Sequence, residues 1–398
     1  MNLGSYLRGL DEAIRYQDGA SLASQLSLRE CNSVKANLLL QLPSDTERQI
    51  QRMFDAPWDE LVYTHLKCAQ SACTYKYVSA FREQQNHIQV LVKILQSQKE
   101  ENWCLPVMCC ACLEVRLLGV QADKQARQKN YKQGELLEKS AESLMSCFRV
   151  CASDNRAALK DSKRLGMLHL VNQLFKIYYS VNTLHLCKPL IRAIEVCAYK
   201  DEFNLGDMVT YRYFVGRKAV FDNELKTAHD YLSFALQNCH PRSLNNKRQI
   251  LIYLIPVKLL LGYQPTPGLL EKYELKEFLE ICHAIKTGNV LKFQQELDKN
   301  EAYFFKIGVY LILERLRMVV YRNLFKRVFL ILGTHQIPIE ALLAVLKSQN
   351  VEDINLAETQ CLLANLVYQN KIKGYISLQH SKLVVSKQNA FPKLSSLN

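Results

Sequence analysis

The chain has 398 residues, of which 48% are hydrophobic and 22% charged, with 14 Gly and 10 Pro. This length allows two or three domains of ~100–200 residues each, and the scarcity of Gly and Pro excludes collagen-like and low-complexity proteins and disfavours an all-β sandwich. The 51 Lys and Arg exceed the 38 Asp and Glu, so the net charge is +13. Such an excess favours polyanionic partners, namely nucleic acid, acidic proteins or anionic lipid.

We find no apolar run of the ~18 residues that a membrane span needs. The N-terminal segment carries charges where a signal peptide has its apolar core. We therefore expect no export route, and we expect the 14 cysteines to be reduced thiols.

Helical periodicity dominates the N-terminal half of the chain. Ser44 and Glu47 have the spacing of a capping box and predict the start of a helix. Apolar residues then recur at steps of three and four, which predicts helices within segments 58–98, 103–120, 135–151, 162–180 and 184–197. Polar joints are expected near 31–46, 121–134, 198–208 and 240–248.

A weak internal repeat favours stacked helical hairpins. Its period is 42 positions, close to that of a tetratricopeptide-type (TPR-like) helix pair. Small residues at Gly216, Ala228 and Ala235 would let two antiparallel helices approach closely. The predicted fold class is therefore all-α, a solenoid of TPR-like hairpins. The repeated residues are Tyr179, Leu186, Leu190 and Ala193, which recur as Phe221, Ala228, Leu232 and Ala235.

The last 80 or so residues differ and predict a small α/β end. Helices are expected over 338–348 and over 356–369, the second capped by Asn355 with Glu358. The period then switches to two, which predicts a strand near 371–378, a turn, and a returning strand over 382–387. This order is typical of a winged helix. Segment 303–332 is left open as one helix or two.

Charge gathers in this C-terminal module. From Arg315 to the end there are 11 Lys or Arg and 4 Asp or Glu, a surplus of 7 over 84 residues. A basic hairpin and first helix could contact phosphates, and Tyr375 could stack on a base or sugar. The alternative is a solvated face or a surface for an acidic protein, and composition does not choose between them.

Nothing in the sequence indicates catalysis. Cys109 and Cys112 form a C-x-x-C without the second pair that a zinc site needs, in an apolar stretch that predicts a buried helix. No metalloprotease, phosphate-loop, dinucleotide or serine-elbow motif occurs. Glu114 and Glu195 are interpreted as ordinary surface or capping charges. We predict no catalytic residue, cofactor or metal; the rival hypothesis is an enzyme that uses the 109–112 thiols.

Longer motifs carry a family resemblance. AIKTGNVLKF (284–293) resembles the helix pair of PCI domains, which consist of helical hairpins followed by a winged helix. Nearly the whole chain resembles the PCI domain-containing protein two (Thp-one-like) family, most weakly over 1–45. The motifs that carry this likeness are SCFRVCASDNR (146–156), LVNQLFKIYY (170–179), HLCKPLIRAIE (185–195), YRYFVGRKAVFD (211–222), YLIPVKLLLG (253–262), YRNLFKRV (321–328) and KGYISLQHSKLVVSKQNAFP (373–392).

This resemblance implies a non-catalytic subunit of the TREX-two mRNA export complex at nuclear pores. Its partners would be a large scaffold of the Sac-three or GANP type, a small acidic disordered protein of the proteasome lid, and RNA or DNA. The expected location is the nucleus and nuclear envelope, with the cytoplasm left open. A rival is a scaffold subunit of a lid-like or signalosome-like assembly without nucleic-acid contact. The implied nucleic-acid-binding residues are Arg322, Lys326, Arg327, Lys371, Lys373, Tyr375, Lys382 and Lys387.

The resemblance also divides the chain into four parts. Residues 1–200 would form the N-terminal helical-repeat region and 201–318 the helical part of the PCI domain. Residues 319–388 would form its winged helix, and 389–398 a C-terminal tail.

Overall fold

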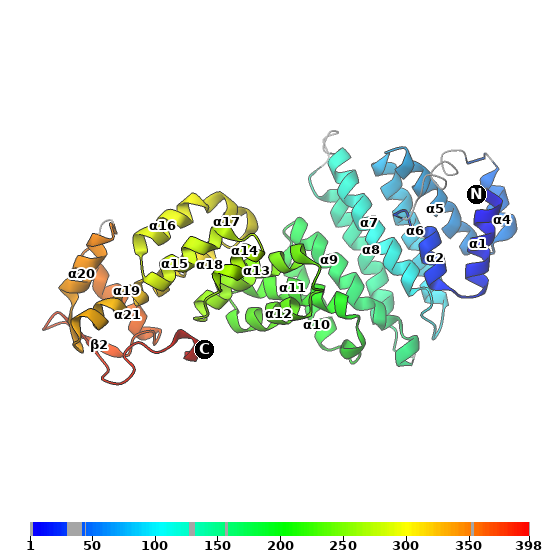
Figure 1. Cartoon of the computed structure of the whole chain (residues 1–398). Coiled ribbons are helices and arrows are strands. Elements are labelled where there is room, and N and C mark those ends of the chain that lie inside the picture. Colours follow the sequence, from blue (N-terminus) through cyan, green and yellow to red (C-terminus); the bar gives the residue numbers. More distant parts are fainter. Residues whose placement is uncertain are drawn as a thin grey trace. The chain divides into compact units, whose positions relative to one another are not determined.

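The computed structural model describes residues 3–29, 42–43, 45–126, 132–155, 158–351 and 354–397 (Figure 1). The chain forms two compact units, residues 1–211 and 212–398, and the division falls within helix α11 (Leu205–Phe221). The four-part division expected from the sequence stays a prediction.

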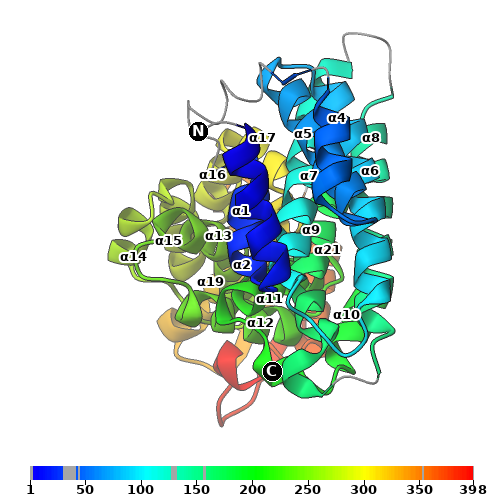
Figure 2. The same cartoon turned by 90° about the vertical axis from the view of Figure 1, so that its right-hand side faces the viewer.

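The described residues of unit 1 fold into helices and contain no strand. Helices α5 to α9 each pack on the next, and α5, α6, α7 and α8 lie side by side in both views (Figures 1 and 2). The helices are α1 (Leu3–Arg15), α2 (Gly19–Leu26), α4 (Thr46–Met53), α5 (Trp58–Cys73), α6 (Tyr77–Ser97), α7 (Leu105–Ala126), α8 (Glu135–Ala152), α9 (Met167–Ser180) and α10 (Cys187–Glu195).

The helices predicted from periodicity are present, with one break that the period does not show. Segment 58–98 holds α5 and α6, because Tyr75 adopts a φ of +58° and turns the chain between them. Residue 45 is the N-cap of α4, and the predicted capping residue Ser44 lies outside the described residues.

Helix α7 is the central helix of unit 1. By length and composition it could cross a membrane, yet half of its most apolar stretch is buried, and it packs on α2, α6 and α8 as a core helix does. Cys112 of α7 and Cys147 and Cys151 of α8 are fully buried. No group of three or more His, Cys, Asp or Glu in the described part of the chain could hold a metal ion.

Glu114 corrects an expectation: it is a buried carboxylate and not a surface charge. Its side chain is 3% exposed and accepts hydrogen bonds from the Leu28 amide at 2.7 Å and from the Ser27 hydroxyl at 3.3 Å. It therefore ties the end of α2 to α7. Glu195 accepts a hydrogen bond from the Tyr211 hydroxyl at 3.0 Å.

Unit 2 begins with more helical hairpins. The close approach predicted at Gly216 is observed, since a Cβ atom there would lie 2.7 Å from Cγ of Leu232. Ala228 and Ala235 are fully buried. The helices that follow α11 are α12 (Leu225–Asn238), α13 (Leu244–Leu260), α14 (Pro267–Lys272), α15 (Leu279–Thr287), α16 (Val290–Lys299), α17 (Glu301–Ile307), α18 (Tyr310–Glu314) and α19 (Arg317–Leu332). Segment 303–332 is neither one helix nor two, because it contains the end of α17 and the whole of α18 and α19.

The structure explains why glycine and asparagine stand together in the PCI-like motif, at Gly288 and Asn289 between α15 and α16. Gly288 ends α15 with a φ of +66°, and Asn289 caps α16 by accepting a hydrogen bond from the Lys292 amide at 2.8 Å. A Cβ atom at Gly288 would lie 2.5 Å from the backbone nitrogen of Leu324, so α19 passes directly against this turn. The motif therefore joins the helical part of unit 2 to the first helix of its winged module.

The winged helix ends unit 2. It contains α19, α20 (Ile339–Ser348), α21 (Leu356–Tyr368) and an antiparallel sheet of strand order β1-β3-β2. The capping box at Asn355 and Glu358 is present as predicted. The hairpin strands are β2 (Gly374–Ser377) and β3 (Lys382–Val385), and the sequence missed strand β1 (Gln336–Pro338). The predicted fold class, helical hairpins followed by a small α/β winged helix, is confirmed.

Candidate nucleic-acid interface

The hairpin presents three of the predicted residues on one face. Tyr375 pairs with Val384 and Ser377 with Lys382 in the sheet register. Directly opposed residues of an antiparallel pair point to the same side, and so do residues two apart on one strand. Lys373 lies one residue before β2, where its carbonyl accepts a hydrogen bond from the Ser386 amide at 2.8 Å, so the pairing continues to it. Lys373, Tyr375 and Lys382 therefore share a face, while Leu383 and Val385 are buried on the other.

This face offers charge beside an aromatic ring. Lys373 is exposed, the Tyr375 side chain is 63% exposed, and Nζ of Lys382 lies 3.3 Å from Oε1 of Gln336. None of the ion pairs of the described residues involves Lys373 or Lys382. Cations without carboxylate partners next to an exposed ring can hold phosphate and stack a base.

Two predicted lysines flank the hairpin. Lys387 is exposed just beyond β3. Lys371 is half-buried before β2, and its pKa is lowered, first by burial and then by the positive charges of Arg315 and Arg322. Burial and the neighbouring positive charges therefore disfavour the protonated form of Lys371.

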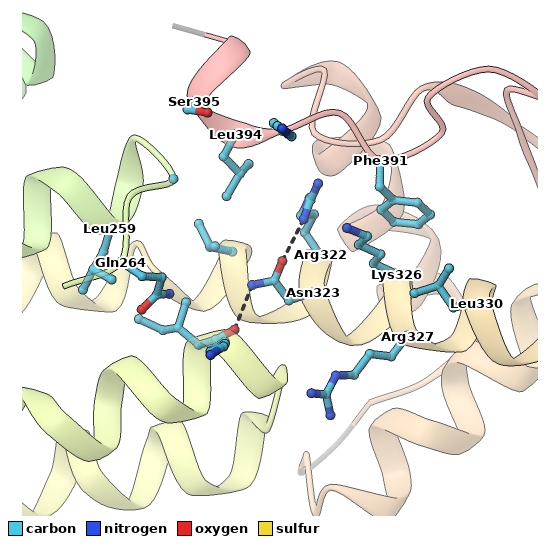
Figure 3. A pocket seen from close by; sticks show the side chains of 15 residues that line it. Leu259, Gln264, Arg322, Asn323, Lys326, Arg327, Leu330, Phe391, Leu394 and Ser395 are labelled. Carbon is cyan, nitrogen blue, oxygen red and sulfur yellow. Dashed lines mark hydrogen bonds between the residues drawn. The ribbon is translucent and has the colours of Figure 1, made fainter. Parts of the chain in front are cut away.

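Helix α19 carries the other three predicted residues. Lys326 and Arg327 are exposed, and both line a groove beside the C-terminal segment (Figure 3). Arg322 is different, because it is only 5% exposed. Its Nη2 donates to the carbonyl of Pro392 at 2.6 Å and its Nη1 donates to Oδ1 of Asn323 at 2.8 Å. Arg322 is thus corrected from an open phosphate contact to a buried residue that anchors the C-terminal segment.

The eight predicted residues therefore fall into three groups, of which Lys371 and Lys387 flank the hairpin. Lys373, Tyr375 and Lys382 lie on the hairpin face, whereas the three residues of α19 line the groove. The groove also contains two lysines that the prediction omitted, Lys286 and Lys393. Lys286 belongs to the AIKTGNVLKF motif, which was quoted only for its likeness to PCI domains.

Helical hairpins that lead into a winged helix are the architecture of a PCI domain, and residues 297–387 match the PCI domain family. Fold and match together define a PCI-domain protein, whose family role is that of a scaffold.

Full-length relatives narrow this class. The chain is 48% identical to PCI domain-containing protein 2 of Xenopus laevis over 398 residues, covering 100% of this chain and 99% of the relative. It is 47% identical to the PCI domain-containing protein 2 homolog of Drosophila melanogaster over 395 residues, with 99% of each chain covered. Identity to the Protein CSN12 homolog of Mycosarcoma maydis is 28%, over 96% and 95% of the two chains. The chain belongs to the PCI domain-containing protein 2 family.

Proposed function

We propose that this protein is a non-catalytic scaffold and nucleic-acid-binding subunit of the TREX-two complex, which couples transcription to mRNA export at the nuclear pore. The observation that carries the proposal is the shared face of Lys373, Tyr375 and Lys382, on which Lys373 and Tyr375 are exposed and Lys382 is half-buried. Its partners would be a scaffold of the Sac-three or GANP type, a small acidic disordered protein, and RNA or DNA, and its location the nucleus.

The mechanism would be electrostatic and additive. The helical hairpins supply a rigid support, and the hairpin face contacts phosphates without reading base edges. A winged helix of the scaffold partner beside it would add a second basic surface. Each surface alone would bind RNA weakly, and joining them would raise the effective concentration of the second contact.

Charge reversal of the hairpin face together with the neighbouring Lys387 tests the proposal. Lys373→Glu, Lys382→Glu and Lys387→Glu together should weaken RNA binding and reduce the dependence of log K on log salt by about 2, since each single-strand phosphate contributes ~0.7. The measurement is a filter-binding salt titration of the full chain, alone and with its partner. An unchanged slope would refute RNA contact by this face.

A structural scaffold without nucleic-acid contact is the second candidate. Exposed apolar side chains favour it: Ile331 is 82% exposed at the end of α19, and Leu378 is 68% exposed at the hairpin turn. Such residues are typical of a surface that another protein covers. Capture of partners from nuclear extract with and without nuclease separates the candidates, because partners bridged by nucleic acid are lost on digestion.

A further inference from the structure

A cationic groove lies in unit 2, apart from the hairpin face. It has a volume of about 440 Å³ and is bounded by α19, the ends of α13 and α15, and C-terminal residues 391–395 (Figure 3). This volume falls in the range of ligand sites, ~300–1,000 Å³. Among the described residues its lining contains no Asp or Glu, and its five cationic residues there are Lys286, Arg322, Lys326, Arg327 and Lys393.

Arg322 is the buried centre of this groove. Its two Nη atoms donate to Asn323 and Pro392 as described above. Its Nε atom has no hydrogen-bond partner among the described residues. None of the ion pairs among the described residues involves Arg322, Lys286, Lys326 or Lys393. A buried guanidinium is costly without a counter-charge, and burial lowers its pKa. A bound anion would supply the missing charge.

The walls of the groove are held in place by contacts between distant segments. Asn323 donates from Nδ2 to the carbonyl of Ile285 at 2.8 Å, which fixes α19 against α15. The C-terminal segment is fixed by the Arg322 bond to Pro392 and by Phe391, whose ring centroid lies 5.5 Å from that of Phe329. Such preorganisation lowers the cost of ordering a site on binding.

Apolar side chains complete the lining. Leu259, Val319 and Leu330 also line the groove and make part of its wall apolar. Charge attraction is stronger where the surroundings are less polar. The groove therefore suits an anion with several charged oxygens better than it suits a carboxylate on a flexible peptide, because its lining offers several cationic side chains.

We propose that this groove is a binding site for phosphate groups, with Arg322 as its fixed centre and Lys286, Lys326, Arg327 and Lys393 as its rim. The phosphates come either from the backbone of the RNA bound by the hairpin face, in which case the inference rests on the proposed function, or from a small free polyphosphate.

The first experiment uses inorganic tripolyphosphate as the probe of the full-length chain, by calorimetric titration at constant ionic strength. The groove variant is Lys286→Glu with Lys326→Glu, and it should bind tripolyphosphate at least tenfold more weakly than the wild type. The matched control is Lys276→Glu with Lys306→Glu, which changes the same charge at two exposed lysines outside the groove. The neutral pair Lys286→Gln and Lys326→Gln should show a smaller loss and guards against misfolding of the Glu variant.

A second arm identifies the source of the phosphate. If the groove variant also loses RNA affinity, and tripolyphosphate competes with RNA, the groove takes backbone phosphates. If RNA binding is unchanged while tripolyphosphate binding falls, the groove takes a free polyphosphate. Equal tripolyphosphate binding by the wild type, groove variant and control overturns the site.

The hairpin variant separates this inference from the proposed function. Lys373→Glu, Lys382→Glu and Lys387→Glu lie outside the groove lining and should leave tripolyphosphate binding intact. If that triple variant keeps full RNA affinity, the hairpin proposal fails while the groove stands. If tripolyphosphate binding falls equally in the hairpin and groove variants, a separate groove site is overturned.

Discussion

Gly288 shows how a single backbone position fixes the junction in unit 2. Its φ of +66° is unfavourable for residues with a side chain, and Leu324 of α19 leaves no room for a Cβ atom. Gly288→Ala should therefore lower the free energy of unfolding by about 2–4 kcal/mol, combining the left-handed backbone cost with overpacking. Urea denaturation followed by circular dichroism measures the loss.

Gly268 of α14 provides the matched control. It has no heavy atom within 4 Å of where a Cβ would lie, and its φ is not positive. Gly268→Ala should leave stability unchanged or raise it by up to ~1 kcal/mol through helix propensity. Equal effects of the two substitutions would contradict the close approach of α19 to Gly288.

His87 predicts how unit 1 responds to acid. Its ring is 2% exposed, and Nδ1 lies 3.1 Å from the carbonyl of Leu61. Burial lowers its pKa to about 4, partly offset by this hydrogen bond. The unfolded chain, with a His pKa of ~6.5, binds the proton more readily, so stability falls as the pH drops from about 6.5 towards 4.

The expected loss from this group is about 2 kcal/mol at pH 5 relative to pH 8. His87→Gln keeps a polar side chain near Leu61 and removes the titration. The difference in unfolding free energy between variant and wild type, measured by urea titration at several pH values, should shift in favour of the variant below pH 6.5. Parallel pH profiles would show that His87 does not carry the effect.

At the scale of elements, the cap of α21 sets the start of the helix that leads into the wing. Oδ1 of Asn355 accepts from the Glu358 amide at 2.9 Å, and Oε2 of Glu358 accepts from the Asn355 amide at 3.1 Å. Asn355→Ala should destabilise the fold by about 0.5–2 kcal/mol, as read from the thermal midpoint. Asn365→Ala, exposed within the same helix, should have no such cost; an equal loss would mean that the cap contributes nothing.

The sequence predicted elements whose signal is local. Helix periodicity, the Asn355 box and the alternation around Tyr375 each involve neighbouring residues, and each prediction was confirmed. Strand β1 was missed because it has only three residues and ends at Pro338, and its partners on β3 lie more than 40 positions away. No local pattern marks so short a strand.

The candidate site shows the same limit. The hairpin face could be predicted from alternation, since its residues are close in sequence. The groove could not, because Lys286, Lys326 and Lys393 come from three separate segments. Arg322 is buried in part because the C-terminal segment packs against α19, with the Pro392 carbonyl accepting its hydrogen bond. The surplus of Lys and Arg identified the C-terminal module as basic. Only the fold distinguished an exposed cation such as Lys326 from the buried Arg322.

At the scale of the whole molecule, the distribution of thiols tests whether the chain has an active cysteine. Cys112, Cys147 and Cys151 of unit 1 are buried, and burial raises the pKa of the Cys109 thiol to about 12. Raised pKa values and poor access disfavour the thiolate that a thiol enzyme needs. Cys361 on α21 is the exposed thiol among the described cysteines, which are otherwise buried or half-buried.

Thiol labelling of the native chain should therefore modify Cys361 faster than Cys109 or Cys112. Iodoacetamide modification, mapped by mass spectrometry over time, measures the order, and Cys361→Ser should remove its peptide from the fast phase without accelerating the others. In denaturant all 14 cysteines should react alike. Native labelling of Cys109 or Cys112 ahead of Cys361 would require an accessible, low-pKa thiol in unit 1 and would revive the enzyme hypothesis against the scaffold one.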